Sequence, residues 1–278
     1  NNVYINCLNS KFKIKGDSAK EYPQIPDVNE DKLYSIPQDV LKSMIKQTVF
    51  ATSQDQTKPI LMGELLEIEN GNINLVAIDG YRFAVRSCQV DNLIHEDLKA
   101  KIIIPGKTLI DVNSLLSSEE DVKVGFNEKN AIFIINDTKI VTRLLEGEFI
   151  DYKKLCPREY NSKIKLKTKD LLNSIERASL LSQSEQNNLI KLSIRDSMMA
   201  ITSNNEKGNV YEEVALSLEG DYLDIAFNSR YLLEGLKNID CEEIYIEFTT
   251  NVNPCIIKPA DGTKYTYLLL PVRISSNN

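Results

Sequence analysis

The chain has 278 residues, enough for about two domains of ordinary size that each bury their own core. Its 42% of hydrophobic residues is typical of a globular protein; because no apolar run approaches the ~20 residues of a membrane helix and the N-terminus lacks a signal pattern, we expect a soluble, cytoplasmic protein. The formal net charge of −7 argues against tight nucleic-acid binding over the whole surface, although cations can gather on one face of an acidic protein.

The first 33 residues fit neither of the two repeats that follow them. They contain one alternating strand, Lys11–Lys15, which puts Phe12 and Ile14 on one face and lysines on the other. A linker that contains two prolines comes next. We expect residues 1–33 to be the end of a preceding copy of the repeat together with this linker.

The rest of the chain repeats itself. Ile36–Ala51 aligns with Leu166–Leu181, so that Leu41 matches Leu171 at an offset of 130 residues. Apolar residues recur at helical spacing in these segments, and each is predicted to form an amphipathic helix.

The second half of each repeat agrees as well. Pro105–Leu115 aligns with Asn228–Lys237, and both are predicted as short helices. The strand-like alternation of Val122–Phe126 returns in Ile244–Phe248. Each repeat therefore predicts strand, helix, hairpins, strand, short helix and hairpins, which is an α+β domain of two helices packed on antiparallel sheets.

A proline separates the two repeats. In Cys156-Pro157-Arg158 the proline removes a backbone donor and interrupts regular strand pairing. This predicts one domain over residues 34–157 and another over residues 158–278.

The segment Leu61–Ala84 predicts a β-hairpin followed by the turn Asp79-Gly80-Tyr81-Arg82. On local grounds this is a turn in which Gly80 supplies a positive φ angle. Three more motifs follow in order along the chain. They are Arg143–Tyr152, Ile225–Leu233 and Tyr267–Arg273.

Together these four motifs resemble those of bacterial DNA polymerase III beta subunits, the sliding clamps of replication. The resemblance implies repeated DNA-clamp domains, and it identifies residues 1–33 as the end of a first domain that is mostly absent from this sequence. It also implies a ring of two full-length subunits around duplex DNA, which keeps a polymerase near the primer end without reading sequence. The alternative is a stand-alone clamp-like peptide-binding module that does not encircle DNA.

The resemblance further implies a surface cleft for a short hydrophobic motif carried by the replicative polymerase alpha subunit, the clamp-loader delta subunit and repair polymerases. An apolar groove rimmed by Arg82, Lys154 and Arg273 suits leucine or phenylalanine anchors combined with a polar or acidic residue. At the positions where the family usually has Thr, His, Leu and Pro, this chain has residues that are larger or more apolar. We therefore expect a more apolar groove. The implied cleft residues are Leu61, Ile78, Gly80, Tyr81, Arg82, Phe83, Ile150, Lys154, Leu155, Asn228, Tyr231, Val252, Pro254, Leu268, Leu269, Leu270, Pro271, Val272 and Arg273.

Cations on or beside the four predicted helices are implied to face DNA, with Lys58 as the best single candidate. The locally simpler interpretation of each is a solvated helix face. These DNA-facing candidates are Lys42, Lys46, Lys58, Lys107, Lys169, Arg177, Arg230 and Lys237. The subunit interface is implied to contain Phe12, Ile14, Leu180 and Leu181, and because the first domain is incomplete we expect this form to be mainly monomeric.

The sequence contains little evidence for a catalytic site. The five cysteines are scattered without a Cys-x-x-Cys pair, which indicates reduced thiols rather than disulfides or a zinc site. No phosphate-binding loop or metal-spaced ligand cluster is found, and no cofactor is expected. The remaining enzyme hypothesis would use Cys88 or Cys156 as nucleophile with His95.

Overall fold

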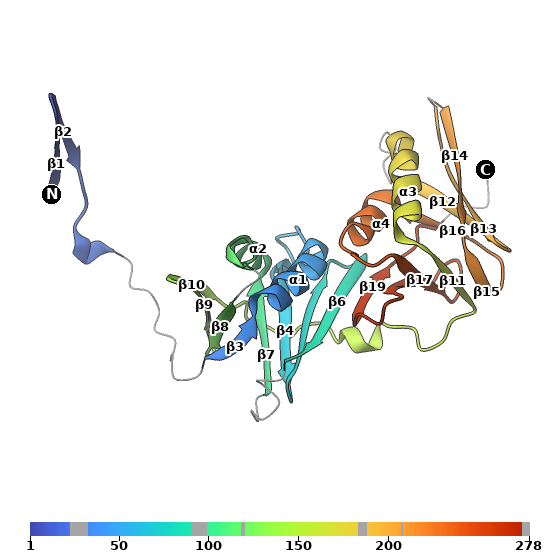
Figure 1. Ribbon diagram of the computed structural model, residues 1–278, viewed down its shortest axis with the longest axis horizontal. Helices are drawn as coiled ribbons and strands as arrows, with labels where there is room; N and C mark the ends of the chain where they lie inside the picture. Colours follow the sequence, from blue (N-terminus) through green and yellow to red (C-terminus); the bar gives the residue numbers. More distant parts are fainter. Residues whose placement is uncertain (23–32, 91–98, 118–119, 183–187, 207, 274–278) are drawn as a thin grey trace.

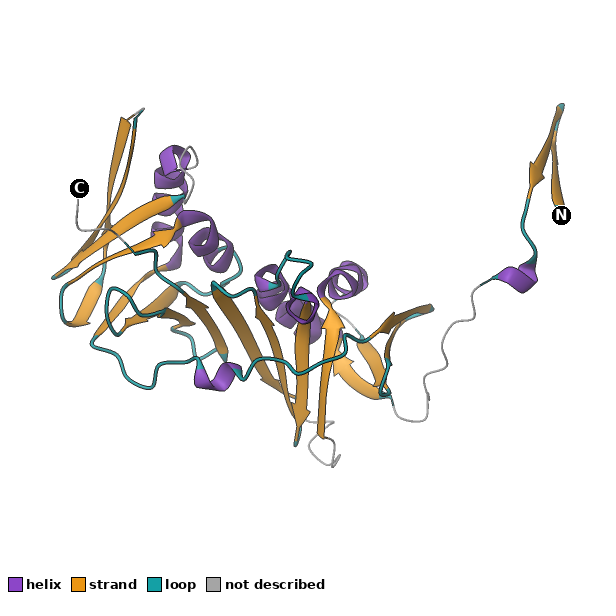
Figure 2. Cartoon of the chain, turned by 180° about the vertical axis from the view of Figure 1, so that it is seen from behind, coloured by secondary structure: helices purple, strands orange, loops and turns teal. Residues whose placement is uncertain are grey.

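The computed structural model describes residues 1–22, 33–90, 99–117, 120–182, 188–206 and 208–273. Within these residues the chain forms an N-terminal hairpin and two larger bodies, each built of helices and strands (Figure 1). The α-helices of both bodies lie on one side of the molecule, and the sheets lie on the other (Figures 1 and 2).

The middle body follows the predicted order of elements. Short 3-10 turns at Val49–Ala51 and Pro59–Met62 connect its first helix to its first hairpin. Its elements are β3 (Tyr34–Pro37), α1 (Gln38–Thr48), β4 (Gly63–Glu69), β5 (Asn72–Ile78), β6 (Arg82–Gln89), β7 (Lys99–Pro105), α2 (Gly106–Leu115), β8 (Asp121–Phe126), β9 (Asn130–Ile135) and β10 (Thr138–Arg143).

The last body repeats this order and adds one short strand, β15. Its elements are β11 (Ser162–Lys167), α3 (Thr168–Ser182), β12 (Leu189–Arg195), β13 (Met198–Asn205), β14 (Gly208–Ala215), β15 (Ser217–Gly220), β16 (Leu223–Asn228), α4 (Ser229–Leu236), β17 (Glu243–Phe248), β18 (Cys255–Pro259) and β19 (Tyr265–Leu269). The predicted α+β class, with two helices against antiparallel strands in each repeat, is confirmed.

One sheet runs through both bodies. Its nine strands have the order β15-β11-β17-β18-β19-β6-β5-β4-β7, so strand β19 of the last body pairs directly with β6 of the middle body. The register runs from Tyr265 opposite Arg86 to Leu269 opposite Arg82. Two four-stranded sheets, β10-β9-β8-β3 and β14-β13-β12-β16, complete the two bodies. A continuous hydrogen-bond ladder thus fixes the position of one repeat against the other.

Equivalent helix positions are buried in the two repeats. In α1 the side chains of Leu41, Met44 and Ile45 are at most 3% exposed, and in α3 those of Leu171 and Ile175 are fully buried. Each such side chain contributes about 1.5–3 kcal/mol relative to an exposed position. The helical periodicity read from the sequence therefore reflects the cores that hold the helix layer on the sheets.

The N-terminal hairpin pairs β1 (Asn2–Cys7) with β2 (Ser10–Lys15), and every residue of both strands is exposed. Phe12 and Ile14 lie on the same face of β2, as predicted, and are 56% and 52% exposed. A 3-10 turn, Ala19–Glu21, follows the hairpin.

Candidate functional site

A groove of about 270 Å³ lies where the two bodies meet. Four parts of the chain build it: the β5–β6 turn with the strand ends beside it, the segment after β10, the residue before β18, and β19 with the residue that follows it. We call this groove the anchor cleft. Its lining residues are Ile78, Gly80, Tyr81, Arg82, Phe83, Ile150, Leu155, Pro254, Leu268 and Leu270, all of which belong to the implied cleft set.

The β5–β6 turn is shaped by its own sequence. The Asp79 carboxylate accepts hydrogen bonds from the backbone N–H of Tyr81 at 2.9 Å and of Arg82 at 3.1 Å, which closes a tight turn. Gly80 has φ of +96°, a conformation that side chains rarely adopt. The expected positive φ is confirmed, and the turn leaves the Tyr81 ring 61% exposed at the edge of the cleft.

The side chain of Arg82 lies in a different place from the one expected. It was expected to rim the groove with its charge, but the residue is only 6% exposed. Its guanidinium bonds the Asp79 carboxylate at 2.9 Å and the Glu234 carboxylate of α4 at 2.6 Å, and it donates to the Phe50 carbonyl at 3.0 Å. It also lies 4.5 Å from the centre of the Tyr231 ring. Arg82 therefore joins the two bodies beneath the cleft, because its partners come from both of them.

Two tyrosines extend this junction to the surface. The rings of Tyr81, from the middle body, and Tyr231, from α4, stack with centroids 5.8 Å apart. Asn228 caps α4 by accepting from the backbone N–H groups of Arg230 and Tyr231. Tyr231 thus packs beside Tyr81 at the edge of the cleft, and neither Asn228 nor Tyr231 is among its lining residues.

Strand alternation divides the terminal run of leucines. Leu268 and Leu270 line the cleft, whereas Leu269 points into the core of the last body and is fully buried. Leu61 is 8% exposed and packs in the same apolar cluster as Phe83 and Leu268, so it supports the floor.

The other implied cleft residues lie outside the lining set. Lys154 is exposed and ion-paired to Asp151 at 2.8 Å. Val252 is 54% exposed, and the Val272 N–H donates to the Ala226 carbonyl at 2.8 Å. Pro271 is half-buried, and Arg273 is exposed at the end of the described chain.

All eight DNA-facing candidates are exposed, but they differ in their partners. Five of them have a partner. Lys42 donates to the Leu116 carbonyl. The other four form ion pairs at 2.5–3.1 Å, which are Lys46 with Asp240, Arg177 with Glu212, Arg230 with Glu234 and Lys237 with Glu176. Lys58, Lys107 and Lys169 make no ion pair with the described residues. Sequence reasoning missed these carboxylates because each comes from another element, except Glu234, which lies one helical turn from Arg230.

The implied interface residues occupy two places. Leu180, on α3, is 72% exposed, and its neighbour Leu181 is half-buried. Phe12 and Ile14 lie on the N-terminal hairpin. No described contact joins the hairpin pair to the helix pair.

The chain matches two family descriptions over nearly all of its two bodies. Residues 35–151 match the DNA polymerase III beta subunit, central domain, and residues 153–273 match the DNA polymerase III beta subunit, C-terminal domain. The chain belongs to the DNA polymerase III beta subunit family. This confirms the resemblance and the interpretation of the chain as a sliding clamp rather than an enzyme.

Individual beta subunits agree with this assignment. The beta sliding clamp of Staphylococcus epidermidis is 37% identical over 267 residues, which are 95% of this chain and 70% of the relative. The crystal structure of the Bacillus subtilis sliding clamp superposes with a TM-score of 0.94 at 34% identity, over 99% of this chain and 73% of that one. The Thermotoga maritima beta subunit superposes with a TM-score of 0.88 at 27% identity, over 99% and 74%.

Two of the three residues of the enzyme hypothesis lie in the described structure. Cys88 and Cys156 are partly buried free thiols, and burial raises the pKa of Cys156, which makes it a poorer nucleophile. His95 lies outside the described residues. In the described part of the chain no group of three or more His, Cys, Asp or Glu side chains could hold a metal ion, and no helix could span a membrane.

Proposed function

We propose that this beta subunit is a non-catalytic processivity factor, which encircles duplex DNA in the cytoplasm as a ring and holds the replicative polymerase through the anchor cleft. The observation that carries the proposal is the convergence of four separate chain segments on one apolar groove at the junction of the two bodies. Tethering raises the effective concentration of polymerase at the primer end without any chemical step.

The same cleft is proposed to receive linear motifs of the clamp-loader delta subunit and of repair polymerases. Ile78, Phe83 and Leu268 give it an apolar floor, and Ile150, Leu155 and Leu270 are 39–43% exposed at its sides. Leucine or phenylalanine anchors fit such a surface, since a few buried apolar side chains carry most of the binding energy of a short peptide.

A fluorescent peptide with adjacent leucine and phenylalanine anchors tests the cleft. Leu270→Asp places a charge against the groove and should weaken binding more than tenfold, as expected for an unpaired charge against an apolar wall. Met198→Asp is the matched control, because Met198 is similarly exposed, at 42% against 39%, on strand β13. Equal affinity of the wild type and Leu270→Asp, measured by fluorescence anisotropy, would reject the cleft assignment.

We also propose that the helix layer faces the DNA. Lys58, Lys107 and Lys169, whose ammonium groups have neither an ion pair nor a hydrogen bond among the described residues, are then the most available for phosphates. In the full-length protein, replacing all three by glutamate should reduce retention on circular DNA and lower the slope of log K against log salt by up to about 3. Lys123→Glu, Lys129→Glu and Lys264→Glu together change the net charge by the same amount at exposed sites and serve as the control. An unchanged slope in the triple variant would remove these lysines from the DNA channel.

We propose that the chain consists of clamp domains 34–157 and 158–278, and that residues 1–33 are the end of a first domain, which meets the last domain of the other subunit. In the full-length homodimer Phe12 and Ile14 of one subunit are proposed to meet Leu180 and Leu181 of the other. Full-length protein with Phe12→Glu and Leu181→Glu should sediment as a monomer. A full-length protein that never dimerises, yet binds the peptide, would favour the stand-alone peptide-binding module.

A further inference from the structure

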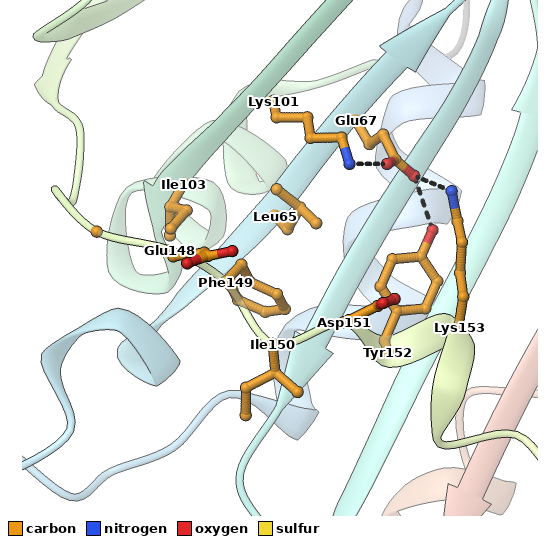
Figure 3. Close-up of a pocket in the computed structure, with 11 residues that line it drawn as sticks. Leu65, Glu67, Lys101, Ile103, Glu148, Phe149, Ile150, Asp151, Tyr152 and Lys153 are labelled. Carbon is orange, nitrogen blue, oxygen red and sulfur yellow. Dashed lines mark hydrogen bonds and ion pairs between the residues drawn. The ribbon is translucent and has the colours of Figure 1, made fainter.

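A second hollow, of about 370 Å³, lies next to the anchor cleft under the segment that connects the two bodies. Figure 3 shows the side chains around it. We call it the Glu67 pocket. Its walls are Leu65 and Glu67 of β4, Lys101 and Ile103 of β7, and residues 147–153 of the connecting segment.

One end of the pocket is a buried carboxylate with several donors. Glu67 is only 4% exposed, and its oxygens bond Lys101 Nζ at 2.8 Å, Lys153 Nζ at 3.1 Å and the Tyr152 hydroxyl at 2.8 Å. Asn74 donates a further hydrogen bond at 3.2 Å. Burial alone would raise the pKa of Glu67, but these donors outweigh it and lower the pKa to about 2. The carboxylate is therefore a fixed anion at neutral pH.

This anion holds two ammonium groups at the surface. The Lys101 and Lys153 side chains are 71% and 61% exposed, so their cationic ends reach the solvent while Glu67 restrains them. An ammonium group has three donors, and the bond to Glu67 uses one, which leaves donors on both lysines for another acceptor. Two cations share one anion here, so this end of the pocket carries an excess positive charge.

The acidic groups nearby do not cancel that excess. Asp151 and Glu69 also attract Lys101, but each has a lysine of its own, Asp151 pairing with Lys154 at 2.8 Å and Glu69 with Lys99 at 3.0 Å. Glu148 lies toward the opposite end of the pocket, on the far side of Phe149 from the Glu67 carboxylate in Figure 3. A ligand carboxylate would therefore be attracted to the lysine end and repelled from the Glu148 end.

The pocket adjoins the anchor cleft. Ile150 lines both hollows and is 42% exposed, so it forms the ridge between them. The apolar side chains beneath them, Leu65 and Ile103 on one side and Phe83 and Leu268 on the other, belong to one cluster on the sheet face opposite the helices. A chain lying in the cleft can therefore cross Ile150 and continue on the same surface.

We propose that the Glu67 pocket receives an acidic side chain next to the apolar anchor of the peptide in the cleft, held by Lys101 and Lys153. The stem of this side chain packs on Leu65 and Ile103. The inference rests on the proposed function and extends it, because it names a second determinant of which partners bind. Partners with an acidic residue at the correct spacing are favoured over partners with a basic one.

Peptide titrations test the pocket on the 278-residue chain. Glutamate is placed at each position up to about six residues on either side of the anchor, a span of ~20 Å in an extended chain. One position should bind about fivefold more tightly than the core peptide, the size of a good exposed ion pair. Lysine at that position should abolish the gain, and glutamine should reduce it.

The protein variant is Lys101→Gln with Lys153→Gln, which removes both cations. It should lose the glutamate gain and bind the core peptide within about twofold of the wild type. Lys129→Gln with Lys264→Gln changes the net charge equally at exposed sites and should keep the gain.

The outcomes separate the pocket from the cleft. A core peptide that does not bind the wild type would contradict the proposed function itself. Normal core binding without gain from any glutamate position overturns the pocket alone. The pocket is also overturned if the gain from glutamate is the same in the Lys101/Lys153 variant as in the Lys129/Lys264 variant. Lys101 and Lys153 then contribute nothing beyond their net charge.

Discussion

Strand β4 buries two glutamates on opposite faces of the same sheet, and their environments give them different charges. Glu67 lies on the face of the anchor cleft, where cationic donors lower its pKa to about 2. Glu64 lies on the helix-covered face, fully buried, and burial raises its pKa to about 8 despite a contact with Thr48. Burial of a carboxylate therefore does not set its charge. The presence of cationic donors decides it.

The contacts of Thr48 agree with a neutral Glu64. Its hydroxyl oxygen lies 2.8 Å from the Met44 carbonyl and 2.6 Å from Glu64 Oε2. A hydroxyl has one proton, so both contacts are hydrogen bonds only when Glu64 carries a proton of its own and donates it to Thr48. Because Glu64 has no cation among its described partners, its carboxyl group stays neutral and hydrogen-bonded.

The largest expected effect comes from Glu64→Gln. Folding raises the pKa of Glu64 from 4.5 to about 8. The proton that this group holds therefore stabilises the folded protein in full below pH 4.5, and this stabilisation is lost as the pH rises to 8. Wild-type stability should therefore decline across this window by up to about 1.4 kcal/mol per pH unit, and the variant should lack that decline. Urea unfolding from pH 5 to 8 measures it. Parallel pH profiles would show that Glu64 is ionised in the folded protein.

Glu67→Gln should change stability in the opposite direction. The folded pKa is lowered from 4.5 to about 2, so the ionised group stabilises above pH 4.5 and this contribution is lost as the pH falls through 2. We expect the variant to be ~2 kcal/mol less stable at pH 7, since two exposed lysines are screened partners. The deficit should shrink in acid. A variant as stable as the wild type at pH 7 would contradict the ion-pair assignment.

Thr48→Val probes the neutral site without altering its charge. Removing the hydroxyl leaves the buried Glu64 carboxyl group without its partner and should cost about 1–2 kcal/mol at pH 6. Thr48→Ser keeps the hydroxyl and provides the control for the hydrogen bond. Thr48→Val keeps the methyl group that Thr48→Ser loses, so a valine variant at least as stable as the serine variant would show that the hydroxyl does not stabilise the neutral carboxyl group.

Added salt should change stability the least, but it should distinguish Glu67 from Glu64 most clearly. Raising NaCl from ~0.1 M to ~1 M shortens the Debye length from about 10 Å to 3 Å and screens the exposed lysines around Glu67. The stability difference between wild type and Glu67→Gln should fall by a few tenths of a kcal/mol. The difference for Glu64→Gln at pH 8 should remain the same. Equal salt responses would mean that both carboxyl groups have similar surroundings.

Much of the fold was predictable because it depends on local periodicity. The segment Ile36–Ala51 was predicted as one helix, and the structure has α1 over Gln38–Thr48 with a 3-10 turn after it. Leu166–Leu181 corresponds to α3 at Thr168–Ser182. The boundaries shift by a few residues because strand pairing and tertiary contacts decide where each helix begins.

The site was predictable only in part. The lining of the anchor cleft followed from motifs that resemble a known family, and all ten of its residues were in the implied set. Glu64 and Glu67 were not singled out, because their partners come from α1, β7 and the connecting segment. The inward orientation of Arg82 was missed for the same reason, since Glu234 lies far along the chain. Pairings between distant elements leave no pattern in a single sequence.

The β6–β19 ladder makes the junction between the two bodies a poor hinge. Bending there would have to break a row of hydrogen bonds together and pull Arg82 from Glu234. In a ring of the proposed kind, mechanical strain during opening would then pass through each subunit and concentrate at the joints between subunits. A spin-label pair placed across β6 and β19 should keep its distance while the ring is loaded onto DNA, and a change in that distance would show that the subunit itself flexes.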